Sequence, residues 1–195
     1  MTNSTSGSAD TLIETGHRQM DPPGRQLRTA FGAFPTGVVV VTALHQMAGA
    51  LGMTMSSFTS ISLDPPVILF SIDRRAASLP AWLEVSGYAV NVLARDQQDL
   101  SNRFARPLSE KWRGLSFERG LHGAPLIKDA LACFECSAER TLSAGDHVIF
   151  LARVDRFVCN ERTEPLVFHR GRYRSLTRDD AGDLTTADWP LPIHY

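Results

Sequence analysis

Short β-branched and aromatic runs recur along this sequence, separated by turn residues rather than by long amphipathic helices. Their sequences are GVVVVTAL (37–44), LGMTMSS (51–57), VILFSI (67–72), YAVNVLA (88–94), residues 130–142, residues 147–159 and PLVFHRGRYRSL (165–176). About six or seven strands without regular strand–helix alternation favour an antiparallel barrel that closes on itself over a parallel sheet. We therefore predict a mainly β fold with a few short helices.

Three short helices are expected around these strands. The first is predicted by the helical spacing of four apolar residues, Leu27, Ala30, Phe31 and Phe34. Pro35 is expected to end this helix. Ser78 is expected to cap the second helix, which ends at Gly87, and Asp96 the third. In the third helix, Leu100 and Phe104 share a face.

The chain divides into one domain and two tails. Its 195 residues are enough for one well-packed core. Residues 1–24 are rich in Ser, Thr and Gly and predict a disordered tail. Residues 25–177 are expected to form a single domain, and residues 178–195 an irregular C-terminal tail.

Charge and hydropathy restrict the partners. With 20 basic and 21 acidic residues the net charge is −1, which provides no general field for nucleic acid or anionic lipid. No apolar run approaches the roughly 18 residues of a membrane span. The first 16 residues lack the basic and apolar regions of a secretory signal. We expect a cytoplasmic protein without nucleic-acid or membrane partners.

Cys133 and Cys136 have the C-x-x-C spacing of some metal and redox sites. They lie in a strand-like stretch, where residues three apart point to opposite faces. No fourth ligand is evident, so we predict buried, reduced thiols and no metal site.

The densest polar signal lies in GMTMSSFTSISLDPP, residues 52–66. Six hydroxyls fall within nine positions: Thr54, Ser56, Ser57, Thr59, Ser60 and Ser62. One interpretation is a solvated strand face. The other is a bend at Ser57-Phe58 whose hydroxyls and backbone N–H groups hold a ribityl chain or a phosphate.

Two further segments carry polar residues among apolar ones. Ala144-Gly145-Asp146-His147 forms a turn, and His147 opens the apolar strand VIFLARV. This imidazole is either a structural or exposed strand-end residue, or a group that hydrogen-bonds a ligand. Residues 168–173 contain cationic and aromatic side chains. These side chains either contact a nucleotide by charge and stacking, or are solvent-exposed residues at a strand end. Neither a G-x-G-x-x-G motif nor a P-loop is present.

Together these segments resemble the flavin reductase-like family, the short reductase components of two-component flavin monooxygenases. The resemblance runs from about Leu27 to Leu176 and rests on five motifs: FGAFPTGVVVVT, GMTMSSFTSISLDPP, YAVNVLARDQQDLSNRFA, AGDHVIFLARV and PLVFHRGRYRSL. It implies a split β-barrel homodimer that binds exchangeable FMN or FAD and takes hydride from NADH or NADPH. The reduced flavin would pass by diffusion to a partner monooxygenase.

The same resemblance implies a set of site residues. Thr36, Gly37 and Val38 would line the isoalloxazine edge through their backbone. The ring edge, ribityl chain and phosphate would be held by Thr54, Ser56, Ser57, Phe58 and Ser60. Asn91 would point into the site, and Phe104, Ala105 and Lys111 would close its phosphate side. His147, with Asp146 beside it, would lie near the nicotinamide, and Tyr173 would flank the same pocket.

Other functions stay open at this point. A protein of this kind could reduce another acceptor, such as a ferric chelate or a corrinoid. It could instead be a flavin-binding electron carrier that does not oxidise NAD(P)H. An FMN-dependent oxidase is less favoured, because no substrate-phosphate motif is present.

Overall fold

The computed structural model describes residues 24–107, 110–160 and 164–176. The tails predicted at 1–24 and 178–195 lie outside these residues, apart from Gly24. Helices are α1 (Arg25–Phe31), α2 (Leu79–Glu84), α3 (Gln98–Ala105) and the short 3-10 turn η1 (Leu121–Gly123). Strands are β1 (Thr36–Gly37), β2 (Val39–His45), β3 (Gly49–Met55), β4 (Thr59–Leu63), β5 (Pro66–Asp73), β6 (Gly87–Val92), β7 (Phe117–Arg119), β8 (Pro125–Ile127), β9 (Ala132–Ala144), β10 (His147–Cys159), β11 (Val167–His169) and β12 (Arg172–Arg174).

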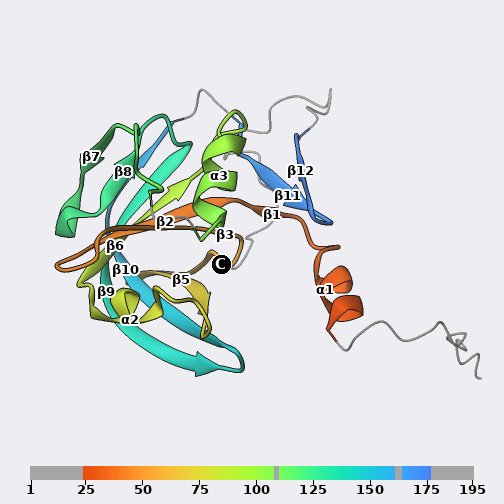
Figure 1. Ribbon diagram of the computed structural model, residues 1–195, viewed down its shortest axis with the longest axis horizontal. Coiled ribbons are helices and arrows are strands. Elements are labelled where there is room, and N and C mark those ends of the chain that lie inside the picture. The colour runs from red at the N-terminus through yellow and green to blue at the C-terminus, as the bar shows by residue number, and fades with distance from the viewer. Residues whose placement is uncertain (1–23, 108–109, 161–163, 177–195) are drawn as a thin grey trace, which may run out of the picture.

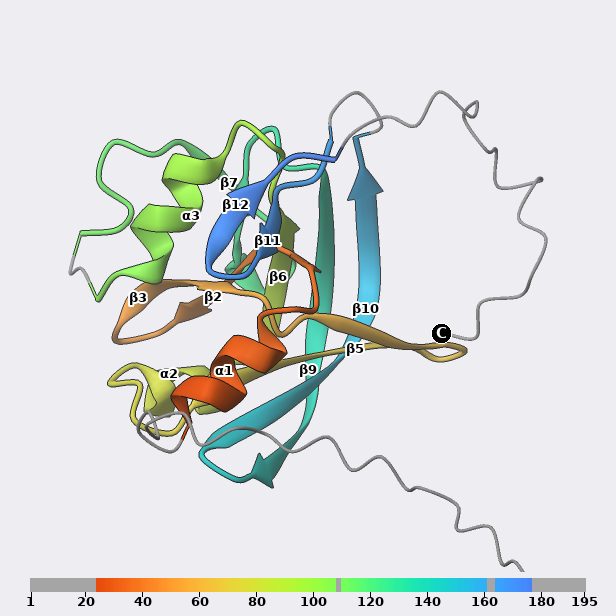
Figure 2. The ribbon, with the colours of Figure 1, turned by 90° about the vertical axis from the view of Figure 1, so that its right-hand side faces the viewer.

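Seven strands form one curved antiparallel sheet in the order β3-β2-β6-β9-β10-β5-β4 (Figures 1 and 2). β3 and β4 occupy opposite edges, although only residues 56–58 separate them in sequence. Four Cα–Cα steps span at most about 14 Å, so the two edges must converge at this link. They do not pair with each other along the described strands. The fold is therefore a split β-barrel, and the predicted mainly β fold with a few short helices is confirmed.

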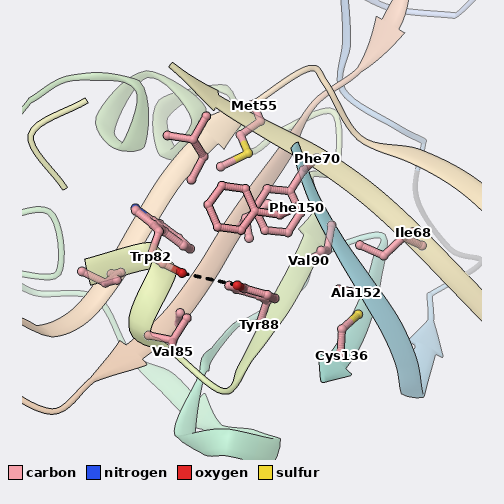
Figure 3. Packing of buried hydrophobic residues seen from close by; sticks show 14 of the residues in the cluster. Met55, Ile68, Phe70, Trp82, Val85, Tyr88, Val90, Cys136, Phe150 and Ala152 are labelled. Carbon is pink, nitrogen blue, oxygen red and sulfur yellow. Dashed lines mark hydrogen bonds between the residues drawn. The ribbon is translucent and has the colours of Figure 1, made fainter. Parts of the chain in front are cut away.

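The main core lies inside the curve of the sheet, against α2. Figure 3 shows the rings of Phe70 and Phe150 stacked, with centroids 5.1 Å apart, and Tyr88 placed edge-on to Phe70. The Tyr88 hydroxyl donates to the carbonyl of Trp82 on α2 (3.3 Å). Because Trp82 is only 1% exposed, this bond and its buried ring fix α2 to the sheet.

A second core lies beneath α3. Phe104, which is fully buried, packs with Val38, Leu93 and Leu166. Its ring meets that of Trp112 edge-on at 4.8 Å. The predicted shared face of Leu100 and Phe104 is confirmed, since both side chains pack in this core. α3 is thereby held beside β3, where the candidate site lies.

Several local predictions differ from the structure. The helix expected to reach Phe34 ends at Phe31, and no α1 residue is buried. The second helix ends at Glu84 rather than Gly87. Gln97, not Asp96, is the N-cap of α3: its Oε1 accepts from the Ala94 amide (3.0 Å) and its Nε2 donates to the Lys128 carbonyl (2.8 Å).

Three strand predictions also change. The hydroxyl-rich segment contains the edge strand β4, and β7–β8 form a small pair that was not expected. The single last strand is a hairpin, β11–β12, that turns at Arg170-Gly171. Among the described helices, none has the length and apolar character that a membrane crossing requires.

Candidate functional site

Two adjoining cavities lie between α3 and the β3 edge of the sheet. The inner cavity, of about 170 Å³, is lined by Val38, Thr54, Met55, Ser56, Ser101, Ala105, Phe168 and Tyr173. The α3 cavity, of about 670 Å³, extends outward along β3 past Phe104 and Lys111 to Trp112. Thr54 and Ala105 line both. Together they are of the size of small-molecule sites, roughly 300–1,000 Å³.

The predicted residues that the fold brings to these cavities come from distant parts of the chain. They are Val38, Thr54, Ser56, Phe104, Ala105, Lys111 and Tyr173. The inner cavity has aliphatic and aromatic walls with an exposed hydroxyl, that of Ser56, at its rim. Such walls suit a flat aromatic ring, and the hydroxyl suits a polar chain attached to it.

Lys111 supplies a cation in the α3 cavity. Its Nζ donates to the carbonyls of Gly52 (3.1 Å) and Phe104 (2.9 Å), which fix the side chain between β3 and α3. Partial burial lowers the pKa of this ammonium. An ammonium carries three N–H donors, so one is left for an anion such as a phosphate.

Hydrogen bonds tie α3 to the walls of the inner cavity. Thr54 Oγ1 donates to the Ser101 carbonyl (2.7 Å), so its hydroxyl hydrogen is used within the protein. The Tyr173 hydroxyl donates to Asn102 Oδ1 (3.0 Å), and Ser101 Oγ lies 2.8 Å from the Tyr173 hydroxyl oxygen. Thr54 and Tyr173 therefore shape the cavity through carbon surface and fixed position more than through free hydroxyls.

Asp146 and His147 lie at the turn between β9 and β10, and neither lines the two cavities. Gly145 takes a φ of 56°, as expected of a two-residue hairpin turn with glycine in first place. His147 Nδ1 lies 2.7 Å from Asp146 Oδ1, and this contact lowers the pKa of the carboxyl. An ionised carboxylate accepts a hydrogen bond from Nδ1–H, and the side chain of His147 is 41% exposed.

The turn nevertheless adjoins the α3 cavity through one short segment. The Arg74 amide donates to the Asp146 carbonyl (2.9 Å), and Arg74 Nε to that of Gly145 (3.1 Å). Residues 76–78, which begin two positions after Arg74, form part of the wall of the α3 cavity.

The remaining predicted residues lie elsewhere. Thr36 and Gly37 pair with β11, and the Val38 amide donates to the Leu166 carbonyl (3.1 Å), so this amide is not free for a ligand. Ser57 bonds to the Ser71 backbone. Phe58 packs against Phe134 (5.8 Å), and Ser60 is exposed on β4.

Asn91 was expected to point into the site, and the structure does not support this. The side chain is fully buried, and its Nδ2 donates to the Val40 carbonyl (3.0 Å). Its Oδ1 accepts from the Ile127 amide (2.8 Å), so the amide group links β2, β6 and β8. A buried amide must satisfy both ends, and here the protein backbone satisfies them.

Trp112 and residues 76–78 line the α3 cavity but were not singled out from the sequence. The indole Nε1 donates to the Ala50 carbonyl (2.8 Å), which fixes Trp112 beside Lys111. An aromatic residue next to the candidate phosphate-side lysine was the signal that could have found it.

All three cysteines are free thiols; Cys136 is buried as predicted, whereas Cys133 is half-buried and Cys159 is exposed. Burial raises the pKa of both Cys133 and Cys136 to about 12, which makes them poor nucleophiles and metal ligands. Within the described residues, no group of three or more His, Cys, Asp or Glu side chains could hold a metal ion.

Residues 31–177 match the family model described as a flavin reductase like domain. The chain belongs to the flavin reductase-like family. A probable flavin reductase of Rhizobium meliloti (strain 1021) is 42% identical over 149 residues, which cover 76% of this chain and 48% of that protein. The FMN reductase (NADH) SmoA of Agrobacterium fabrum is 40% identical over 154 residues, covering 79% and 87% of the two chains.

This flavin reductase-like chain spans about half the length of the first curated relatives it matches. Among solved structures, it is similar to the NADH:FAD oxidoreductase SgcE6 of Streptomyces globisporus C-1027 in complex with NAD and FAD fragments. The TM-score is 0.77 at 36% identity, and the match covers 84% of this chain and 99% of the other.

Proposed function

We propose that this chain is an NAD(P)H:flavin oxidoreductase that reduces FMN or FAD. The observation that carries the proposal is the pair of adjoining cavities, one with apolar and aromatic walls and one with a fixed ammonium. A flavin has a flat ring and a phosphate-bearing chain, so this set of residues fits it. Two similar proteins, an FMN reductase (NADH) and an NADH:FAD oxidoreductase, support the same reaction class.

When bound, the flavin supplies the hydride-accepting ring. Val38, Met55, Phe168 and Tyr173 would hold this ring in the inner cavity, and Ser56 would contact its polar chain. The third N–H of Lys111 would donate to a phosphate oxygen. Because hydride transfer needs two rings in close contact, these residues would act mainly by positioning.

The test is a rate measurement with the purified protein, NADH or NADPH, flavin and air. Steady, flavin-dependent loss of NAD(P)H supports the reductase. Bound flavin without turnover would instead favour the electron carrier. Ferric chelates or a corrinoid replace the flavin in parallel reactions to test the other acceptors.

We also propose that reduced flavin leaves the protein and reaches a separate monooxygenase. Relatives named as reductase components of a trigonelline monooxygenase and of a two-component tryptophan halogenase support this. Reductase, NADH and flavin would be placed anaerobically on one side of a dialysis membrane, with cytochrome c on the other. Flavin-dependent reduction of the cytochrome supports release, and none across the membrane contradicts it.

A homodimer is the proposed assembly, because two unpaired strand edges carry apolar residues. β4 forms one edge and exposes Ile61 (38%) and Leu63 (78%). β10 continues past its last partner on β5, at Arg153, and exposes Phe157 (67%) and Val158 (64%). Unpaired apolar edges are sites where a second copy can add contacts.

A cytoplasmic location is part of the same proposal. Three free thiols suit a reducing compartment, and the reaction consumes NAD(P)H.

A further inference from the structure

Five exposed arginines gather on α1 and the β11–β12 hairpin. They are Arg25, Arg28, Arg170, Arg172 and Arg174, and the sequences of these elements (RQLRTAF and VFHRGRYR) contain no acidic residue. Arg28, Arg170, Arg172 and Arg174 form no ion pair with the described residues. The whole chain carries a net charge of −1, so this positive charge is local.

The two elements share one hollow of about 560 Å³, which we call the arginine hollow. Arg25 and Arg28 line it from α1, and Arg170 and Gly171 from the hairpin turn. The Arg170 amide donates to the Gly32 carbonyl (2.9 Å), which ties the turn to the end of α1. In Figures 1 and 2, α1 lies below the hairpin.

The same hairpin lines the inner cavity with Phe168 and Tyr173. Only His169 lies between Phe168 and Arg170 in the chain, so the two residues are about 7 Å apart along the strand. An anion held in the arginine hollow would therefore lie one short linker away from a ring in the inner cavity. Lys111, the cation of the α3 cavity, comes from a different segment of the chain.

We propose that the arginine hollow binds the diphosphate of the pyridine dinucleotide. This inference rests on the proposed function, in which a flavin and a dinucleotide meet at the inner cavity. In the dinucleotide one ribose separates the nicotinamide from the diphosphate, which agrees with the short span from Phe168 to Arg170. The α3 cavity already offers Lys111 to the anionic end of the flavin, so Arg28 and Arg170 in the hollow are left for the second anionic substrate. One guanidinium group can donate two parallel hydrogen bonds to a phosphate, and here both α1 and the β11–β12 hairpin supply guanidinium groups.

The test compares the double variant R170Q/R172Q and the single variant R28Q with the original chain. Initial rates are measured against NADH at saturating FMN. Loss of charge-assisted bonds should raise the KM for NADH about ten- to a hundredfold in the double variant, with kcat changed little. The Kd values for FMN and FAD should stay within about twofold. R140Q is the matched control, because Arg140 is exposed on β9 and lines neither cavity nor hollow.

ADP-ribose, which carries the diphosphate without the nicotinamide, provides a readout that does not depend on turnover. Calorimetry should show it binding to the original chain and to R140Q, and more weakly to R170Q/R172Q. If the KM for NADH and the ADP-ribose affinity are both unchanged in the double variant, the proposal is wrong. A weaker Kd for FAD alone would assign the hollow to the flavin and overturn it too. If the chain does not oxidise NADH but loses ADP-ribose binding in the variants, the proposed function fails and the hollow stands.

Discussion

Ser57 lies in the three-residue link between β3 and β4, and its hydroxyl forms two hydrogen bonds with the backbone of Ser71 on β5. It accepts from the Ser71 amide (3.0 Å) and donates to the Ser71 carbonyl (3.3 Å). Ser57→Ala removes both bonds and leaves two part-buried groups unsatisfied, so we expect the free energy of unfolding to fall by about 1–3 kcal/mol. Urea unfolding measures it, with exposed Ser60→Ala as the control, expected within about 0.5 kcal/mol. A loss no larger than that of the control would contradict this role.

His147 allows a second single-residue test. If the imidazole contacts the nicotinamide, His147→Ala should lower kcat about ten- to a hundredfold while the flavin Kd changes little. Asp146→Asn should lower kcat less, because the amide keeps the imidazole in place without its charge. Steady-state kinetics and flavin fluorescence titration supply both values. Unchanged kinetics in His147→Ala would make this residue part of the turn alone.

The hydroxyls of residues 54–62 show where reasoning from sequence stops at this scale. The segment bends where the interpretation put the bend. Whether a given hydroxyl faces a ligand or the protein depends on partners far along the chain. Thr54 meets Ser101, and Ser57 meets Ser71, whereas Ser56 lines the inner cavity. No local pattern separates these three.

At the scale of elements, β3 and α3 approach each other closely at Gly52. A Cβ there would lie 2.5 Å from Cε1 of Phe104, whose ring is fully buried and has no room to move. Gly52→Ala should push α3 outward, destabilise the fold by about 1–3 kcal/mol and weaken flavin binding. Thermal unfolding and flavin titration measure the two effects. Gly37→Ala is the matched control, since a Cβ at Gly37 meets nothing within 4 Å; an equal effect in both variants would contradict the steric cause.

The turn before β8 depends on Glu135 of β9. Its carboxylate accepts from the Leu121 amide (2.5 Å) and from Arg156 Nε (2.7 Å). Burial alone would raise the pKa of Glu135, but these two contacts outweigh it and hold the pKa below its usual range.

A pH dependence follows from this carboxyl. The unfolded chain, with a Glu pKa of about 4.3, takes up the proton first as the pH falls, so the stabilisation present above that value is lost in acid. Glu135→Gln should lower stability at neutral pH and flatten its decline between about pH 5 and 3. Urea unfolding across this range gives the slopes. An unchanged slope would show that other groups control the acid response.

Most long strands could be predicted, because β-branched runs such as 67–72 and 147–159 carry their own signal. β4 could not, since Thr59–Leu63 is a short edge strand with hydroxyls and looks like a loop. The β11–β12 turn was missed because Arg170 takes a φ of 50°, a left-handed conformation that is uncommon for arginine and that the sequence does not predict.

At the scale of the whole molecule, the apolar edges of β4 and β10 are the feature to test. If they form the dimer interface, the original chain should have twice the mass of a 21.5 kDa chain in solution. Leu63→Glu places a charge at a 78% exposed position, where a monomer tolerates it and an interface does not. Light scattering at micromolar concentration should show a dimer for the original chain and a monomer for the variant. A monomer in both would rule out the assembly.

The three-residue link between β3 and β4 also bears on how quickly the chain can fold. β3 and β4 become opposite edges of one sheet only after the strands between them have paired. β5 must pair with β10, some 80 residues later in the chain, and β6 must pair with β9. The β2–β3, β4–β5, β7–β8, β9–β10 and β11–β12 pairs form from near neighbours in the chain. Each distant pairing has a loop-closure cost that must be met before its contacts stabilise anything. Folding should therefore take milliseconds to seconds, as in other β-barrels, with the inner cavity absent until the last edge is in place.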